Sequence, residues 1–193
     1  MKHLFLAILA AGMAFSAAAD DKVVIPDSTG FKFTDVKVIK STPVKDQNKS
    51  GTCWCYSTNS FFENEILRKT GKEVHLSEGF VVWHCYFDKA QKFIRMDGKI
   101  NFAEGGAAED VPYVWNRYGM MPNEAYTGMT HGDKKFNTAE LTAVLSGFLD
   151  VVNSKKLKKL TPSWLEGFQG VLNAYMGKIP ENFTYEYRSC LRM

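Results

Sequence analysis

The sequence predicts an α+β fold in which helices dominate. Five segments carry apolar residues at helical spacing, whereas only residues 23–25 and 31–39, near the start, have the composition of strands. The chain has 193 residues, of which 45% are hydrophobic and 13% aromatic. It is therefore long and apolar enough to form one globular domain with its own core.

The first 19 residues have the pattern of a secretory signal peptide. Lys2 and His3 form a basic start, residues 4–15 are almost entirely apolar, and residues 17–19 are small alanines that suit a cleavage site. The apolar run is too short to span a membrane, and the alternative is a buried N-terminal helix. We expect residues 1–19 to be removed and the mature protein to be exported, to the periplasm or outside the cell.

The helices are expected in the following order. After a loop broken by Pro43, residues 53–69 have a helical pattern that ends before Gly71. Ser77 is a suitable N-cap for a second helix over residues 78–92, since its hydroxyl can accept a backbone N–H of the first turn.

The remaining helices lie in the second half of the sequence. A third helix is expected over residues 107–118, but Pro112 fits poorly inside it, so the helix begins later or kinks there. Residues 138–153 and 163–176 give two more helical patterns. The lysine-rich composition of the segment between them, residues 155–159, indicates a solvated turn.

The composition argues against several kinds of partner and cofactor. A formal net charge of +3, with both signs mixed along the chain, gives no support for a nucleic acid or a membrane surface as the main partner. Four cysteines are too few for a disulfide framework. A zinc site from Cys53, Cys55, His84 and Cys85 would lack the usual C-x-x-C spacing, so we expect no metal and no cofactor.

The segment from Gln47 to Ser57 carries the strongest chemical signal. Gln47 stands six residues before Cys53, a Gly-Thr pair leads into Cys53, and Trp54 follows it at the start of a helix. A helix N-terminus favours a thiolate, which is the nucleophilic form of cysteine. Cys53 is therefore the candidate nucleophile, and the alternative is a buried structural thiol. Cys55, two residues on, is expected in the core.

Acyl transfer also needs hydrogen-bond donors that face the developing oxyanion. The side-chain amide of Gln47 and the backbone N–H of Cys53 are the two candidate donors. Trp54 is expected to form a wall of the site.

This segment resembles the active-site segment of papain-like cysteine peptidases, and further matches follow in the same order. Residues 76–78 read Leu-Ser-Glu, as at the start of that family's second helix, and residues 118–126 match another stretch of it. Gly105 and Gly106 match the paired glycines beside the substrate. The resemblance implies the mainly helical left half of a papain-like fold over residues 20–186, a peptide substrate, and substrate binding by Gly105, Gly106 and Trp54.

The amino-acid sequences of residues 49–54 and 90–106 resemble those of the bleomycin hydrolase, or aminopeptidase C, branch of that family. Ser50 stands where papain has a disulfide cysteine. The resemblance thus implies a thiol protease of the aminopeptidase type, although exopeptidase and endopeptidase activity both remain open.

The histidine that such catalysis needs is not evident in this sequence. His75, His84 and His131 do not match the family's base, and residues 187–193 do not resemble the family. We expect the β-rich right half to be missing through truncation or a frameshift, with weak or no turnover unless a separate C-terminal half or another subunit contributes.

Two alternatives remain. The first is a non-catalytic pseudo-peptidase that binds a peptide or a partner. The second is a redox protein that uses Cys53 and Cys55, but a C-x-C pair lacks the C-x-x-C spacing of thiol oxidoreductases.

Overall fold

The computed structural model describes residues 30, 34–130, 132, 135–154 and 159–186. The chain divides into two units, Met1–Val38 and Ile39–Met193, and the helices of the described residues lie in the second. The predicted signal peptide, the predicted strand at residues 23–25 and the atypical tail at 187–193 lie outside the described residues. The second predicted strand is wrong where it can be judged, because residues 34–39 are irregular and no described strand pairs with them.

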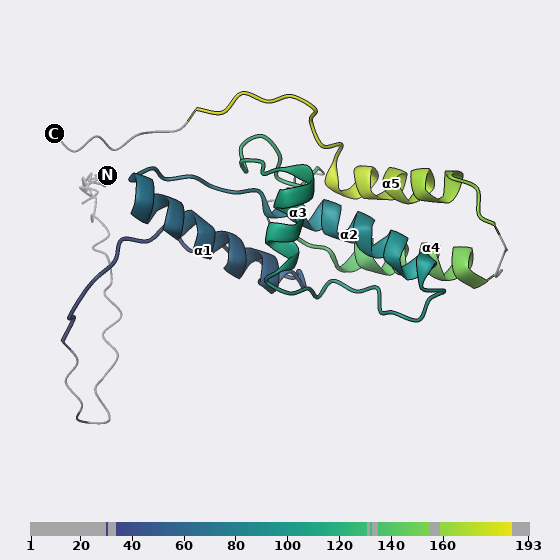
Figure 1. The fold of residues 1–193 in the computed structure, drawn as a ribbon, viewed down its shortest axis with the longest axis horizontal. Helices are drawn as coiled ribbons and strands as arrows, with labels where there is room; N and C mark the ends of the chain where they lie inside the picture. Colours follow the sequence, from purple (N-terminus) through teal and green to yellow (C-terminus); the bar gives the residue numbers. More distant parts are fainter. Residues whose placement is uncertain (1–29, 31–33, 131, 133–134, 155–158, 187–193) are drawn as a thin grey trace, which may run out of the picture. The chain divides into compact units, whose positions relative to one another are not determined.

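The described chain is mainly helical, as predicted, and its helices are shown in Figure 1. They are α1 (Cys53–Thr70), α2 (Glu78–Arg95), α3 (Asp110–Tyr118), α4 (Ala139–Ser154) and α5 (Ser163–Met176). Among the described residues, an isolated antiparallel β-bridge joins Leu76 and Pro122. None of the described helices is both long and apolar enough to cross a membrane.

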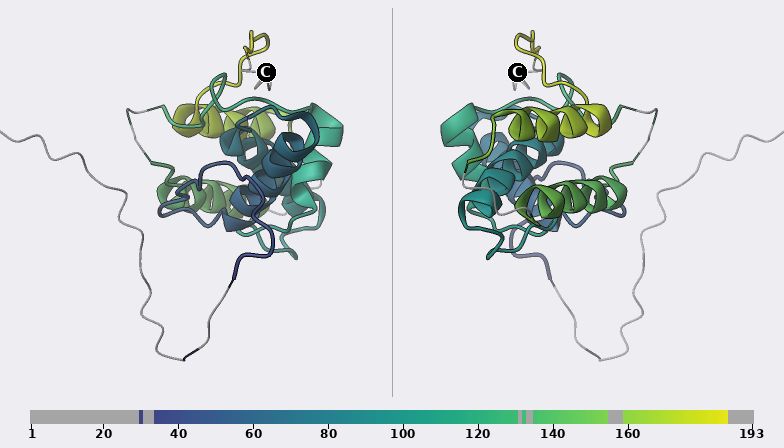
Figure 2. Two further views of the ribbon diagram at one scale, coloured as in Figure 1. Left: turned by 90° about the vertical axis from the view of Figure 1, so that its left-hand side faces the viewer. Right: turned by 90° about the vertical axis from the view of Figure 1, so that its right-hand side faces the viewer.

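Helix α2 is the centre of the second unit, because it contacts each of the other four helices (Figures 1 and 2). Val81, Val82, Tyr86 and Ala90 are each at most 1% exposed. A helix that is apolar on several sides is stable only when neighbours cover those sides. Its start is set by Ser77, whose hydroxyl oxygen accepts the N–H of Phe80 at 2.9 Å, as the sequence predicts.

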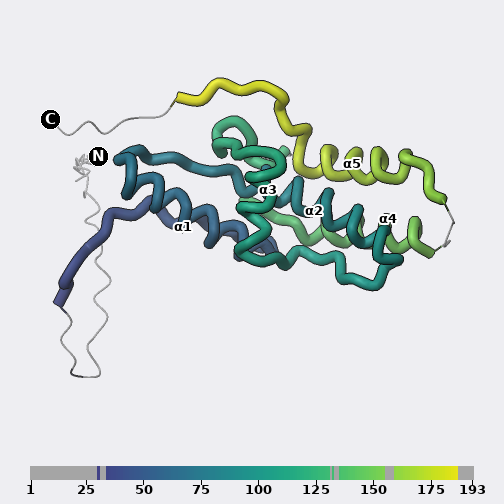
Figure 3. The backbone as a smooth tube through the Cα atoms, viewed as in Figure 1, coloured from purple at the N-terminus to yellow at the C-terminus, as the bar shows by residue number. Residues whose placement is uncertain are grey.

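Helices α4 and α5 pack side by side, and each also contacts α2 (Figure 3). Their buried side chains recur at four-residue intervals, which builds ridges that can interlock between helices. These residues are Leu141, Leu145 and Leu149 on α4, and Phe168, Leu172 and Met176 on α5.

Helix α3 begins at Asp110, three residues later than the first position that the pattern allows. Pro112 therefore falls in its first turn, where the missing N–H would have no partner inside the helix. The later start is one of the two outcomes expected from this proline.

A buried ion cluster attaches the loop before α1 to the body of the unit. Lys45 Nζ lies 2.6 Å from Glu63 Oε1 and 2.7 Å from Glu78 Oε1, and it also donates to the carbonyl of Leu76 at 3.1 Å. Burial opposes the charge on Lys45, but the two carboxylates outweigh that effect and raise its pKa. Burial likewise raises the pKa of Glu78, and Lys45 offsets part of that rise. Residues 45–52 are thus held against α1 and α2.

Candidate active site

The two neighbouring cysteines of α1 lie in opposite environments. Cys53 is the first residue of the helix and is exposed, whereas Cys55 is completely buried. Burial raises the pKa of Cys55 well above its ordinary value, and its Sγ lies 3.8 Å from the carbonyl oxygen of Glu78. Cys55 is therefore part of the core, as predicted, and only Cys53 presents a thiol to solvent at the helix N-terminus.

The start of α1 has no side-chain cap. Thr52 occupies the N-cap position, but its hydroxyl pairs with the hydroxyl of Ser50 at 2.7 Å instead of with the helix. The N–H groups of Cys53 and Trp54 have no acceptor within the described part of the chain. Such unpaired N–H groups attract negative charge.

Gln47 belongs to a tight turn that leads into this helix start. Its side-chain Nε2 donates to the carbonyl of Ser50 at 2.8 Å, and the Ser50 hydroxyl donates back to the carbonyl of Gln47 at 2.8 Å. Asn48 has a φ of 52°, a left-handed conformation that asparagine tolerates better than most residues. A carboxamide has two N–H bonds, so one remains for another acceptor.

Trp54 lies against the loop that carries Gly105 and Gly106, called the glycine loop below. Its indole Nε1 donates to the carbonyl of Glu104 at 3.0 Å. A Cβ on Gly106 would lie 2.6 Å from the Trp54 ring and 2.8 Å from Asp110 Oδ2, so only glycine fits there. Gly105 is open, because an added Cβ would meet nothing within 4 Å. The structure therefore brings Trp54 and Gly106 together, while Gly105 faces free space.

A model of the papain family of cysteine proteases matches residues 28–164, which include every residue of this region. The chain belongs to the papain family. Procathepsin L of Rattus norvegicus is 29% identical over 116 residues, which make up 60% of this chain and 32% of the relative. Cathepsin L2 of Homo sapiens is 51% identical over 85 residues, or 44% of this chain and 23% of the relative.

The fold of this papain-family chain is also found in a solved structure. The crystal structure of PepW from Lactobacillus rhamnosis aligns with a TM-score of 0.56 at 17% identity, covering 79% of this chain and 40% of PepW. This chain spans about a third or less of the length of the curated relatives above. The similarity to PepW concerns the fold alone.

The described histidines, His75 and His84, have their contacts with residues other than Cys53. His75 Nε2 lies 3.6 Å from Glu73 Oε1 and is partly exposed. His84 stacks on Tyr118 with the ring centroids 3.9 Å apart, and burial lowers its pKa to about 4. Its low pKa keeps the ring neutral near pH 7, and the stacking makes it a packing residue of α2. His131 lies outside the described residues.

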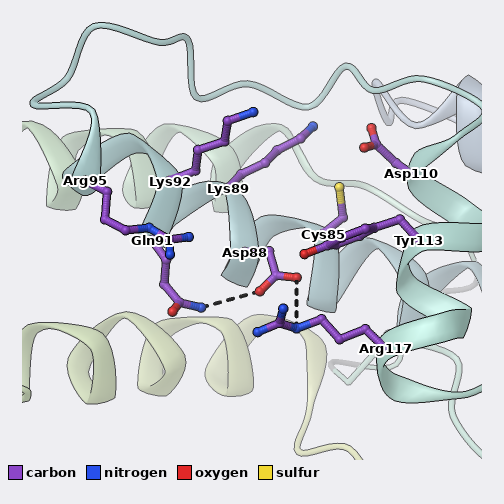
Figure 4. Close-up of a pocket in the computed structure, with 9 residues that line it drawn as sticks. All are labelled: Cys85, Asp88, Lys89, Gln91, Lys92, Arg95, Asp110, Tyr113 and Arg117. Carbon is purple, nitrogen blue, oxygen red and sulfur yellow. Dashed lines mark hydrogen bonds and ion pairs between the residues drawn. The ribbon is translucent and has the colours of Figure 1, made fainter.

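A basic pocket of about 400 Å³ lies between α2 and α3, close to the glycine loop (Figure 4). Most of its charged side chains already have partners. Lys89 Nζ donates to the carbonyl of Gly105 and lies 5.5 Å from the centroid of the Trp54 ring. Asp88 Oδ2 lies 3.9 Å from Arg117 Nε. The side chains of Lys92 and Arg95 have no such partner among the described residues, but both lie in the last turn of α2, where the helix dipole favours cations. Lys89, which lines this pocket, thus supports the glycine loop through its hydrogen bond to the Gly105 carbonyl.

The thiol in this pocket, Cys85, is not a second reactive centre. It is 5% exposed, and burial raises its pKa to about 12. No group of three or more histidine, cysteine or acidic side chains in the described ranges is placed to hold a metal ion.

One residue with several contacts to this region was missed by the sequence reasoning. Glu104 accepts hydrogen bonds from Gly51 and Trp54, which flank Cys53. The only signal in the sequence was a carboxylate directly before Gly105, in a loop that carried no assigned role.

Proposed function

We propose that this chain carries the nucleophile of a cysteine peptidase and that Cys53 is that nucleophile. The observation that supports it is the exposed thiol of Cys53 at an uncapped helix N-terminus, two residues from a cysteine that is fully buried. Family membership supports the same chemistry. We propose that the chain belongs to the aminopeptidase, or bleomycin hydrolase, branch, on the basis of the amino-acid sequences of residues 49–54 and 90–106.

The reaction follows from these groups. The Cys53 thiolate attacks the carbonyl carbon of a peptide bond, and the electron pair of the C=O bond moves to the oxygen. The N–H of Cys53 and the free N–H of the Gln47 amide stabilise that oxyanion, and each such donor contributes roughly 3 kcal/mol to the transition state. The amine leaves with a proton from a general acid, and water then hydrolyses the thioester and releases the thiol.

The substrate is proposed to lie along the glycine loop. Gly105 and Gly106 would hold the peptide backbone, with open space beside Gly105 and the Trp54 ring packed against Gly106. Trp54 would close one side. The general acid and base would be a histidine other than His75 and His84, since those two pack elsewhere. We also propose export of the protein, on the basis of residues 1–19.

A second candidate is a pseudo-peptidase that binds peptides without cleaving them. The placement of His75 and His84 favours it for this chain taken alone. In that case the glycine loop would still bind an extended peptide.

Hydrolysis of fluorogenic aminoacyl and peptidyl substrates separates the two functions. The assay compares this chain with a Cys53→Ala variant and with a Cys85→Ala variant as the matched control. The peptidase proposal expects turnover that Cys53→Ala abolishes and Cys85→Ala retains, with a histidine-bearing C-terminal half added if the chain alone is slow. Turnover that survives in Cys53→Ala, or none with that half present, would contradict it.

A further inference from the structure

Glu104 contacts the chain on both sides of Cys53. It lies in the loop between α2 and α3, and its carboxylate Oε2 accepts the N–H of Gly51, two residues before Cys53, at 2.9 Å. Its backbone carbonyl accepts the indole N–H of Trp54, one residue after Cys53, at 3.0 Å. One residue from a distant loop thus holds the chain at two points, two residues before and one residue after the proposed nucleophile.

The other carboxylate oxygen is tied to α4. Glu104 Oε1 accepts the hydroxyl of Thr138 at 2.6 Å and the hydroxyl of Thr142 at 3.2 Å. Thr138 is 1% exposed and directly precedes α4, and its carbonyl accepts the N–H of Thr142 at 2.8 Å. Hydrogen bonds to an ionised carboxylate are shorter and stronger than neutral ones. The carboxylate therefore bridges the turn before α1 to the start of α4.

The fit between this carboxylate and Gly51 is close. A Cβ on Gly51 would lie 2.6 Å from the Cβ of Glu104, so a side chain at position 51 would displace the bridge. This explains the glycine two residues before Cys53 by a contact 53 positions away in sequence.

The bridge is compatible with the missing side-chain cap of α1. A side-chain cap would occupy an N–H of the first helical turn, the same groups that an oxyanion needs. At α1 the Thr52 hydroxyl is directed to Ser50, and the N–H groups of Cys53 and Trp54 stay open. The bond from Gly51 to Glu104 holds the turn in place without using those N–H groups.

We propose that Glu104 is a positioning residue for Cys53. Its hydrogen bonds to Gly51, Trp54 and α4 hold the start of α1 so that the thiol and the open N–H groups keep a fixed mutual geometry. This inference rests on the proposed function, in which Cys53 is the nucleophile, and adds a residue to that site.

The test measures the rate at which iodoacetamide alkylates Cys53 in the whole folded chain between pH 5 and pH 9. Peptide mass spectrometry gives the extent of alkylation at each time point. Glu104→Ala is expected to slow the reaction about three- to fivefold near neutral pH, because the thiol no longer sits firmly at the helix N-terminus. Glu104→Gln is expected to restore the rate to within about twofold, since its carbonyl can accept from Gly51 and its NH₂ can face the two threonine hydroxyls.

Two further variants complete the test. Glu109→Ala removes an exposed glutamate from the same loop and is expected to leave the rate unchanged. Thr138→Val removes the shorter of the two hydrogen bonds to α4, while the Thr142 hydroxyl and the N–H of Gly51 keep their acceptors. An intermediate rate is expected, and it can be measured even if Glu104→Ala does not fold. Unfolding in urea, measured on each variant, separates lost stability from a changed rate in the folded protein.

The proposal is overturned if Glu104→Ala, while folded, keeps the wild-type alkylation rate. It is also overturned if Glu104→Gln is as slow as Glu104→Ala, because hydrogen-bond geometry would then not be the cause. Should Glu104→Ala fail to fold, a wild-type rate in Thr138→Val would overturn it as well. Alkylation needs no turnover, so a chain that hydrolyses nothing would count against the proposed function and leave this test readable.

Discussion

The turn that leads into α1 and the α4–α5 pair are held by different forces. Polar contacts from distant segments hold the turn: Lys45 pairs with two buried carboxylates, and Glu104 accepts from Gly51. Regular apolar ridges, with side chains such as Leu145 and Leu172, hold α4 against α5. The apolar pair supplies a rigid support, and the polar contacts set the geometry at Cys53. The predictions below act on one region at a time.

The largest effect is expected from Lys45→Met. This change leaves Glu63 and Glu78 buried without their cation, and breaking a buried ion pair costs about 3 to 5 kcal/mol. Urea unfolding at pH 7 measures the loss in the free energy of unfolding. Lys49→Met, at an exposed lysine of the same loop, is the control and should change stability little. A loss below about 1 kcal/mol in Lys45→Met would mean that the cluster does not hold the turn.

Leu145→Ala tests the apolar region. The side chain is completely buried, and a truncation of this kind costs about 2 to 5 kcal/mol, through lost burial and the cavity left behind. In conditions where the variant stays folded, the alkylation rate of Cys53 should equal that of the wild type. A changed rate would show that the two regions are coupled through α4.

His84 gives the unit a dependence on pH. Burial lowers its pKa in the folded chain to about 4, below its ordinary value of 6.5, and Asp88 only partly opposes this shift. Its stabilising contribution is therefore complete above about pH 6.5 and is lost as the pH falls toward 4. We expect a loss of about 1 to 2 kcal/mol, allowing for solvent screening of a partly exposed ring.

The check is the difference in unfolding free energy between the wild type and His84→Phe at pH 7 and at pH 5. The wild type should lose more stability than the variant over this interval. His75→Gln, at a partly exposed histidine, serves as the comparison and should behave like the wild type. Equal losses in the wild type and His84→Phe would refute the assignment.

The smallest effect is expected from Lys89→Met. It removes the hydrogen bond to the carbonyl of Gly105 and the contact over the Trp54 ring, which together should cost about 0.5 to 1 kcal/mol. Lys92→Met removes a lysine of the same pocket that has no such bond, and it should cost less, through the helix dipole alone. If both variants have the same stability, Lys89 does not support the glycine loop.

The comparison also explains what the sequence could predict. The helix predicted over residues 53–69 is observed as Cys53–Thr70, and the one predicted over 163–176 as Ser163–Met176. Apolar periodicity and local signals such as Ser77 and Gly71 act within a few residues, so they can be read directly. The strand predicted over residues 31–39 was wrong over 34–39, because a strand depends on a partner that composition does not reveal.

The candidate site divides in the same way. Fixed offsets around Cys53 suggested a thiol at a helix start, and the structure places Cys53 there. Glu104 could not be found by the same reasoning, since its partners lie 53 residues before it and 34 and 38 residues after it. A carboxylate in a loop has no periodicity, and only the tertiary fold brings it to Gly51.

The central claim is that folding activates the thiol of Cys53. The most direct test compares the alkylation rate of Cys53 by iodoacetamide at pH 6.0 in the folded chain and in the chain unfolded by urea. Because the helix N-terminus exists only in the folded state, the account predicts a faster reaction at Cys53 when the chain is folded, and a slower one at the buried Cys85. An equal or slower rate at Cys53 in the folded chain would contradict the account.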